Sequence, residues 1–328
     1  MRAMSLLEIR DLYVHFKTFD GELKVLDGVN ITIFEGEQVG LVGESGCGKT
    51  LTGKTILGIL PMPPGNIPKG EIHFLGTQIL KMPPRERRRL SSQGLSAIFQ
   101  DPLAALNPVY KIGQQLGDVL KYSAKAKGKN LARKEIRAQS IALLRATGLP
   151  DPERILNSYP VQLSGGMRQR VCISEALSTG AKLLVADEPT TNLDVTIQYQ
   201  ILKLLNQLPE ERGASILLIS HSLGVVRNFT ERVYIMYAGS IVETAKTSVV
   251  FSDPLHPYTK GLLSSVPQLI PKAMSEGIKG DVPNYLEPPK GCRFHPRCEH
   301  VMPICRMEKP VSSSSGDNHK VACFLYQR

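Results

Sequence analysis

The feature that most constrains the fold of this chain is a glycine-rich segment, Gly43-Glu-Ser-Gly-Cys-Gly-Lys49-Thr50, which fits the pattern G-x-x-x-x-G-K-[ST] in full. An apolar run, Gln38–Val42, comes directly before it, and a helical pattern begins at Lys49. Small residues allow the backbone N–H groups of such a loop to turn inward around phosphate oxygens, and the start of the following helix adds partial positive charge. The segment therefore predicts a strand, a phosphate-binding loop and a helix in an α/β fold.

Most positions of this loop have an expected part in binding ATP. Lys49 is expected to reach the β- and γ-phosphates, and the hydroxyl of Thr50 is expected to bind Mg²⁺. Cys47 fills a variable position, and we assign no chemical role to its thiol. The residues expected to contact the nucleotide here are Gly43, Ser45, Gly46, Cys47, Gly48, Lys49, Thr50 and Leu51.

A second acidic motif follows much later in the chain. Leu183-Leu-Val-Ala-Asp187 is an apolar run that ends in a carboxylate, as a second contact to Mg²⁺ requires, either directly or through water. Glu188 comes next, at the expected exposed end of the strand. A carboxylate there is suited to polarise the water that attacks the γ-phosphate. Because the pair follows a phosphate-binding loop, it predicts ATP hydrolysis.

The pattern of the remaining chain predicts its organisation. Turn signals and short apolar runs predict strands over residues 6–42, and after Gly166 strand and helix patterns alternate, which implies a mostly parallel sheet covered on both faces. We expect a P-loop NTPase core of the RecA-like α/β class, with an N-terminal antiparallel β subdomain and an inserted helical subdomain at about 111–175. These parts would form one nucleotide-binding domain, residues 1–251, and residues 252–328 a small cysteine-rich extension.

Composition excludes some classes of function. No apolar stretch approaches the roughly 18 residues of a membrane-spanning helix, and the N-terminus has no signal-peptide pattern. We therefore expect a cytosolic protein that can dock on a membrane. The net charge is +10, partly from the run Lys121–Arg137, which predicts a solvated face or attraction to anionic lipid headgroups. Nucleic acid is disfavoured as a partner, because aromatic residues make up 6% and Trp is absent.

The segment Leu163-Ser-Gly-Gly-Met-Arg-Gln-Arg170 resembles the signature of ATP-binding cassette (ABC) proteins, although the usual form has Gln where this chain has Met167. Ser164 is expected to cap a helix, and Gly165 and Gly166 allow close approach to phosphate. The resemblance implies that this signature completes the active site of the opposite subunit, so that hydrolysis requires a dimer.

Three further residues take roles from the same resemblance. Gln100, in Ala97-Ile-Phe-Gln-Asp-Pro102, resembles the Q-loop glutamine, which senses Mg²⁺ and faces the transmembrane partner. Asn192-Leu-Asp194 resembles the D-loop, with Asn where Ala or Ser is commoner. His221 resembles the switch histidine that contacts the γ-phosphate, and Ser222 follows it where Asp is usual. The sequence does not explain what these departures change.

The family also places an aromatic residue against the adenine base, before the glycine-rich loop. Phe16 fits this position best, and Phe19 is the alternative. Both side chains could instead belong to the core.

Several longer segments narrow the resemblance to the importers of dipeptides, oligopeptides and nickel. They are Met167-Arg-Gln-Arg-Val171, Phe99–Pro108 around the Q-loop and Asp253–Leu263. The final segment, from Gly291 to Cys323, resembles that of the D-type ATP-binding subunit of peptide importers. The match extends over essentially the whole chain.

This resemblance implies an ATPase subunit on the cytoplasmic face of the cell membrane. Its expected partners are a second, related but non-identical ABC ATPase, two transmembrane permease subunits and, through them, an extracytoplasmic solute-binding protein. Nickel or an oligosaccharide remains an alternative cargo, because an ATPase subunit does not contact the cargo. A soluble ABC ATPase that acts on nucleic acid is a weaker alternative.

Four of the six cysteines crowd the end of the chain, and they are Cys292, Cys298, Cys305 and Cys323. Four thiolates could hold Zn²⁺ or a 4Fe–4S cluster. Zinc sites favour pairs of cysteines with two other residues between them, which are absent here, and the resemblance also favours the cluster. Free thiols, or a ligand set that includes His295 or His300, remain open. The site would hold together a segment with little core of its own, or sense redox state.

Overall fold

The computed structural model describes residues 5–191, 193–265, 277–315 and 318–327, and it divides the chain into two compact units. The first unit comprises the described parts of Met1–Phe34, Gln38–Leu80 and Leu218–Arg328. The second comprises Glu35–Glu37 and Lys81–Leu217. The described C-terminal residues therefore belong to the same compact unit as the glycine-rich loop.

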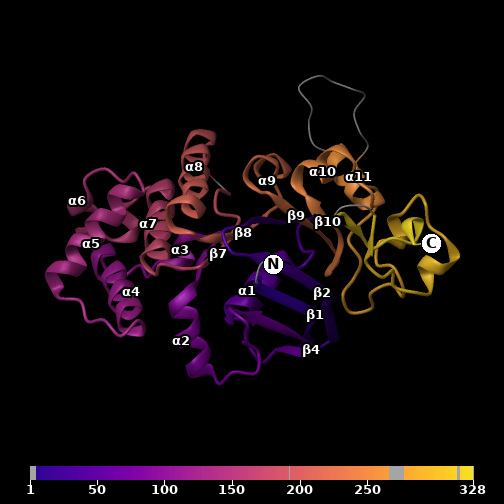
Figure 1. Cartoon of the computed structure of the whole chain (residues 1–328), viewed down its shortest axis with the longest axis horizontal. Helices are drawn as coiled ribbons and strands as arrows, with labels where there is room; N and C mark the ends of the chain where they lie inside the picture. The colour runs from indigo at the N-terminus through magenta and orange to yellow at the C-terminus, as the bar shows by residue number, and fades with distance from the viewer. Residues whose placement is uncertain (1–4, 192, 266–276, 316–317, 328) are drawn as a thin grey trace. The chain divides into compact units, whose positions relative to one another are not determined.

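The first unit contains an antiparallel sheet in the order β2-β1-β4-β5 (Figure 1). Along β1, Leu7, Ile9, Leu12 and Val14 are buried. Leu7 and Ile9 are two residues apart, as are Leu12 and Val14, so the members of each pair share a face of the strand. A shift of register between Ile9 and Leu12 changes the phase between the two pairs and allows both to be buried. The strands are β1 (Ser5–Thr18), β2 (Gly21–Phe34), β4 (Gly65–Phe74) and β5 (Thr77–Gln78).

The same unit holds a second sheet, whose strands run in the order β11-β12-β10-β9-β3. Strand β3 (Gln38–Val42) lies parallel to β9 (Arg232–Tyr237), and β9 pairs antiparallel with β10 (Ser240–Lys246). Nearly every residue of β3 and β9 is buried, which explains why both are continuous apolar runs. The helices of the unit are α1 (Lys49–Leu57), α9 (Leu223–Phe229), α10 (Thr247–Ser252) and α11 (Pro257–Ser264).

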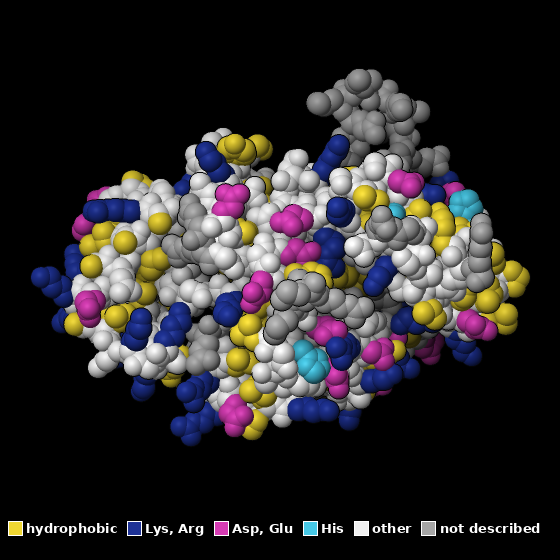
Figure 2. All heavy atoms as spheres, in the orientation of Figure 1, with side chains coloured by type: hydrophobic (Ala, Val, Ile, Leu, Met, Phe, Trp, Pro, Cys, Tyr) yellow, Lys and Arg dark blue, Asp and Glu magenta, His cyan; other side chains and the backbone are white. Residues whose placement is uncertain are grey.

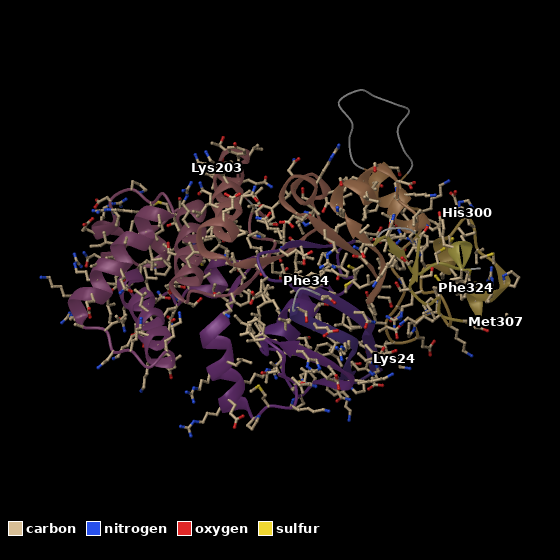
Figure 3. All side chains as sticks on the ribbon, in the orientation of Figure 1. Lys24, Phe34, Lys203, His300, Met307 and Phe324 are labelled. Atoms are coloured by element: carbon tan, nitrogen blue, oxygen red, sulfur yellow. The ribbon has the colours of Figure 1, made fainter. Side chains whose placement is uncertain are left out.

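The C-terminal residues have short elements, and two strands join them to the second sheet. Strand β12 (Lys320–Val321) pairs with β10, and β11 (Ser313–Ser314) pairs with β12. The side chains of His300, Met307 and Phe324 all belong to this segment (Figure 3). Its 3₁₀ helices are His295–Arg297, Pro303–Arg306 and Phe324–Tyr326.

The second unit is built on the strand order β8-β7-β6. Strands β6 (Leu95–Ile98) and β7 (Leu183–Asp187) are parallel, and all of β7 is buried. Strand β8 (Ser215–Ser220) begins in this unit. The other elements are α2 (Pro84–Gly94), α3 (Pro102–Ala105), α4 (Ile112–Ala126), α5 (Arg133–Ala146), α6 (Pro152–Asn157), the 3₁₀ helix Pro160–Gln162, α7 (Gly165–Ser178) and α8 (Val195–Arg212).

Helices α4 to α7 gather around their own apolar cluster (Figure 1). On α4, Ile112, Leu116 and Leu120 recur every four residues, so they share one face of the helix. That face packs with Leu144 of α5 and Ile155 of α6. The polar character of this stretch in the sequence comes from the opposite, solvent-facing sides of the same helices.

The basic run belongs to those solvent-facing sides. Lys121 and Lys125 of α4 and Arg133, Lys134 and Arg137 of α5 are all exposed. Lysine and arginine side chains are interspersed with acidic and apolar ones on the face that Figure 2 shows. In the part of the chain that the structure describes, no helix is both long and apolar enough to cross a membrane.

One carboxyl group belongs to α7 itself and lies among its buried residues. Glu175 is half-buried, its Oε1 has no hydrogen-bond partner among the residues that the structure describes, and burial raises the pKa of the carboxyl to about 7. In the folded state the group therefore binds its proton more tightly than in the unfolded chain. Its contribution to stability is full below the unfolded-state pKa of about 4.5 and is lost as the pH rises through about 7.

We therefore expect Glu175→Gln to raise the free energy of unfolding at pH 8 by about 1–3 kcal/mol, with little change at pH 5. Urea unfolding of the variant at the two pH values measures the difference. Glu210→Gln, an exposed position on α8, is the matched control. An equal effect of Glu175→Gln at both pH values would contradict the expectation.

Candidate functional site

The glycine-rich loop lies between β3 and α1, as the sequence predicts. Its first glycine is sterically required, because a Cβ on Gly43 would lie 2.1 Å from the carbonyl oxygen of Met236 in β9. Gly46 has φ 79°, a left-handed conformation that L side chains rarely adopt, and a Cβ there would face open space. The loop thus leaves room beside its backbone for a ligand.

The ammonium group of Lys49 lies inside this loop. The side chain is only 5% exposed, and Nζ donates hydrogen bonds to the carbonyl oxygens of Gly43 at 2.7 Å and Glu44 at 2.9 Å. A lysine side chain has three donors, and no carboxylate of the described residues pairs with this buried one, so it is suited to an anionic ligand. Cys47 is fully buried nearby, and burial raises the pKa of its thiol. These residues fit the phosphates of a nucleotide.

In the second unit, Glu188 is brought next to Gln100. Gln100 Nε2 and Thr191 Oγ1 both donate hydrogen bonds to Glu188 Oε2, each at 3.0 Å. Glu188 follows the buried strand β7 and has φ 47°, a conformation that costs a non-glycine residue about 1 kcal/mol. Asp187, the last residue of β7, is 7% exposed. The end of β7 therefore presents two carboxylates, one of them oriented by two donors.

The signature segment forms the start of α7. Ser164 is its N-cap, and Ser164 Oγ accepts a hydrogen bond from the N–H of Met167 at 3.3 Å. A Cβ on Gly166 would lie 3.2 Å from Ile197, so glycine lets α7 approach α8 closely. Asp194 caps α8 by accepting from the N–H of Ile197 at 2.9 Å.

An open pocket of about 500 Å³ lies beside this helix start. Its lining includes Ser164, Gly165, Gly166, Met167 and Asp194. The structure thus gathers the signature and the last residue of the expected D-loop around one space. Asn192, the other departure in that loop, lies outside the described residues.

The remaining expected site residues lie in the first unit. His221 follows β8 directly and is exposed. Phe16 is half-buried in β1, where it lies opposite Leu23 of β2 and Gly65 of β4. Phe19, the alternative adenine contact, is fully exposed at the β1–β2 turn. Thr50 is the second residue of α1 and is half-buried.

Two residues near Glu188 were not predicted from the sequence. Thr191 donates to Glu188, and Gln169 is 2% exposed and donates through Nε2 to the carbonyl oxygen of Pro189 at 2.7 Å. Gln169 thereby ties the signature helix to the segment after Glu188. Its place inside the signature was a usable signal, whereas a contacting threonine three residues after Glu188 has no distinctive pattern.

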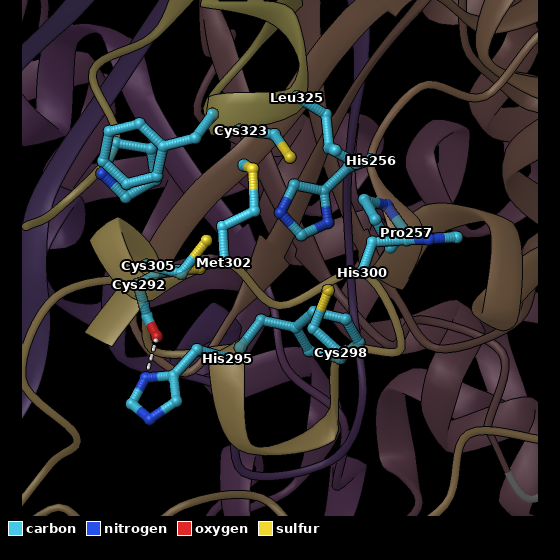
Figure 4. A pocket seen from close by; sticks show the side chains of 13 residues that line it. His256, Pro257, Cys292, His295, Cys298, His300, Met302, Cys305, Cys323 and Leu325 are labelled. Atoms are coloured by element: carbon cyan, nitrogen blue, oxygen red, sulfur yellow. Dashed lines mark hydrogen bonds between the residues drawn. The ribbon is translucent and has the colours of Figure 1, made fainter.

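The predicted 4Fe–4S cluster, and with it the zinc alternative, is wrong. No group of three or more His, Cys, Asp or Glu residues in the described ranges is arranged to hold a metal ion. The four cysteines do line one cavity (Figure 4), but its volume is about 10 Å³, room for roughly one water molecule. Burial raises the pKa of Cys292 to about 11 and also raises those of Cys298 and Cys323.

Other side chains line this cavity together with the cysteines. Met302 and the ring of His256 project among the sulfur atoms (Figure 4). His295 Nδ1 lies 3.0 Å from the carbonyl oxygen of Cys292, and the N–H of Cys292 donates to the carbonyl oxygen of Cys305 at 2.9 Å. The crowding of the cysteines in the sequence correctly predicted that they lie close together, but it did not determine whether they bind a metal.

Two family models match the chain. The model described as "ABC transporter" matches residues 26–191, and the model described as "Oligopeptide/dipeptide transporter, C-terminal region" matches residues 242–305. The first match contains the loop, the signature and Glu188.

Similar proteins cover nearly the whole chain. The oligopeptide transport ATP-binding protein OppD of Bacillus subtilis is 42% identical, over 99% of this chain and 90% of that protein. The dipeptide transport ATP-binding protein DppD of the same organism is 40% identical, over 98% of this chain and 95% of that protein. OppD of Salmonella typhimurium is 44% identical, over 98% of this chain and 94% of that protein. These names describe ATP binding and peptide transport, and none mentions an iron–sulfur cluster.

The fold matches solved ABC structures. The dimeric post-hydrolysis state of the ATP-binding cassette MJ0796, bound to ADP and Pi, superposes with a TM-score of 0.66 at 26% identity, over 74% of this chain and 98% of that one. The loop geometry, the oriented Glu188, the matched models and this fold agree. The chain belongs to the ABC transporter family of ATP-binding proteins, and it is an ATPase.

Proposed function

We propose that this chain is the ATP-hydrolysing subunit of a membrane importer for dipeptides or oligopeptides. One observation carries the choice of cargo: the C-terminal region, residues 242–305, matches the oligopeptide/dipeptide transporter model. Relatives named as peptide transport ATP-binding proteins share 40–44% identity with the chain. The ATPase motifs alone do not discriminate between cargoes, because they contact only nucleotide.

The first step in the mechanism is capture of ATP by the glycine-rich loop. Its backbone N–H groups and the start of α1 bind phosphate oxygens, and Lys49 neutralises charge on the β- and γ-phosphates. The contacts expected beside Lys49 come from Gly43, Ser45, Gly46, Cys47, Gly48, Thr50 and Leu51. Phe16 is the proposed contact of the adenine base, because its ring is partly accessible on an ordered strand.

Mg²⁺ accompanies ATP in this family and neutralises charge on the phosphates as it develops. The candidate ligands, taken from the sequence motifs, are Thr50, Asp187 and Gln100. A hydroxyl, a carboxylate and an amide carbonyl are the hard oxygen donors that Mg²⁺ prefers.

Glu188 is the proposed general base. It takes a proton from the attacking water as the new P–O bond forms. The hydrogen bonds from Gln100 and Thr191 hold one oxygen of the Glu188 carboxylate in place. The side chain therefore loses less conformational entropy when it reaches the transition state. His221, exposed after β8, is the proposed contact to the γ-phosphate.

The signature acts on a second nucleotide, that of the opposite subunit. Ser164, Gly165 and Gly166 line an open pocket at the N-terminus of α7, a 14-residue helix whose partial positive charge favours an anion. Asp194 lines the same pocket. Closure of two such subunits on ATP drives the permease, and hydrolysis resets it.

The proposed partners are a second, related ABC ATPase, two transmembrane permease subunits and a solute-binding protein, and no nucleic acid. The chain would then act at the cytoplasmic face of the cell membrane as a peripheral subunit. The basic faces of α4 and α5 suit such a position, because they would lie near anionic headgroups.

Transport by the assembled complex tests the cargo. We expect that the transporter reconstituted in liposomes with this subunit hydrolyses ATP several-fold faster when its solute-binding protein is loaded with a dipeptide or oligopeptide. Nickel ions and an oligosaccharide serve as matched cargoes. Stimulation by nickel or the oligosaccharide and not by peptide would refute the proposal and leave the ATPase assignment in place.

A further inference from the structure

The C-terminal region, residues 242–305, contacts the phosphate-binding loop directly. Arg297, in the 3₁₀ helix His295–Arg297, donates to both carboxylate oxygens of Glu44, at 2.7 Å and 3.2 Å. Glu44 is the second residue of the loop, and its carbonyl oxygen also accepts from Lys49. The side chain of Arg297 is 6% exposed, so this bidentate pair is largely shielded from water.

Two tyrosines from the same region contact the loop as well. The hydroxyl of Tyr285 donates to the carbonyl oxygen of Gly46 at 2.8 Å. The hydroxyl of Tyr258, in α11, accepts from the N–H of Glu44 at 2.9 Å. Three side chains from separate parts of the C-terminal region therefore contact the Glu44–Gly46 stretch of the loop.

Arg297 is itself held in one position. Its Nε donates to the carbonyl oxygen of Lys279 at 2.9 Å, and its Nη2 also donates to that of Ile278 at 3.1 Å. The guanidinium lies 5.7 Å from the ring centroid of Tyr237. Because most of its donors already have partners, the guanidinium presents a fixed geometry to Glu44.

The segment that carries Arg297 is anchored to the rest of the first unit. Phe294 packs edge-on against Tyr237 with ring centroids 5.0 Å apart. Further along, the buried carboxylate of Glu243 in β10 accepts from the N–H groups of Leu255 and His256, and His319 Nε2 lies 2.8 Å from it. Residues before and after Arg297 in the sequence therefore pack against the rest of the first unit.

The charge of Glu44 explains what this contact could do. A carboxylate in a loop that binds phosphates repels its ligand. At an effective dielectric constant of about 20, the repulsion between two unit charges about 8 Å apart lowers the binding affinity by about tenfold to thirtyfold. Arg297 neutralises that carboxylate through the bidentate pair.

We propose that Arg297 is a positioning residue for ATP binding, which neutralises and orients Glu44 so that the C-terminal segment sets the affinity of the phosphate-binding loop. This inference rests on ATP binding at the loop. The C-terminal region thereby takes part in ATP binding, a role that the sequence motifs do not indicate.

Titration of the purified full-length protein with a fluorescent ATP analogue tests this role. We expect Arg297→Met to weaken binding about tenfold, through the unpaired charge of Glu44, and to raise the KM for ATP more than it lowers kcat. Glu44→Gln added to Arg297→Met should restore most of the affinity, because it removes that charge. A merely structural role of Arg297 predicts no such rescue.

Lys309→Met is the matched control, since Lys309 belongs to the same segment and pairs with Asp27 at 2.8 Å without touching the loop. We expect it to leave ATP affinity unchanged. If Arg297→Met does not fold, Arg297→Lys takes its place, with an expected threefold loss that Glu44→Gln again reverses, because a lysine cannot form the two parallel bonds.

Three results would overturn the inference: wild-type affinity in the arginine variant, an equal loss in Lys309→Met, or no recovery in the double variant. A wild-type protein that fails to bind ATP at all would instead refute the ATPase mechanism from which the inference starts. The two failures are therefore distinguishable in one set of titrations.

Discussion

Glu188→Gln is expected to lower the rate of ATP hydrolysis at least about 100-fold while ATP affinity stays within about twofold. Glutamine keeps the size of the side chain, and its amide oxygen can still accept the hydrogen bonds from Gln100 and Thr191. It cannot take a proton from water at neutral pH. The change therefore removes the general base and leaves the nucleotide contacts of the loop in place.

Single-turnover hydrolysis and analogue binding, measured on the same preparation, separate the two effects. The matched control is Glu210→Gln, which changes an exposed glutamate of the same unit and should leave both quantities unaltered. Hydrolysis by Glu188→Gln at more than a tenth of the normal rate would show that another group activates the water.

Lys49→Ala is expected to weaken ATP binding by about 100-fold or more, and hydrolysis falls with it. The ammonium is the buried positive charge of the loop, and its loss also leaves the carbonyl oxygens of Gly43 and Glu44 without that donor. Both consequences act on the same step, since phosphate binding needs the charge and the ordered loop.

Analogue titration again gives the affinity, and thermal unfolding with and without ATP shows whether the nucleotide still stabilises the fold. Lys54→Ala is the control, because Lys54 lies on the same helix α1 and is exposed. ATP that still raises the melting temperature of Lys49→Ala by the normal amount would contradict the assignment of this lysine.

The glycine-rich loop was predictable because it is local. Its eight residues are contiguous, and the flanking strand β3 and helix α1 follow from the apolar pattern around them. The capping of α7 by Ser164 is local in the same sense, since donor and acceptor are three residues apart. The roles of these residues toward ATP, and the domain boundary at residue 251, stay predictions.

The four cysteines show the limit of spacing as evidence. Their crowding near the C-terminus did predict proximity, and they line one cavity. Whether a cavity holds a metal depends on its size and on how the sulfur atoms point, and both are set by packing. Met302 and His256, neither of which is distinctive in the sequence, line the same cavity.

The sequence by itself determined the family, the ATPase chemistry and the residues that are close along the chain. Only the tertiary structure decided which distant residues meet: Gln100 lies 88 positions from Glu188 and Arg297 lies 253 positions from Glu44, yet both pairs are hydrogen-bonded. Periodicity and turn chemistry act over a few residues and so can be seen in a single sequence. A pairing between distant side chains follows from how whole strands and helices pack, and no local pattern encodes it.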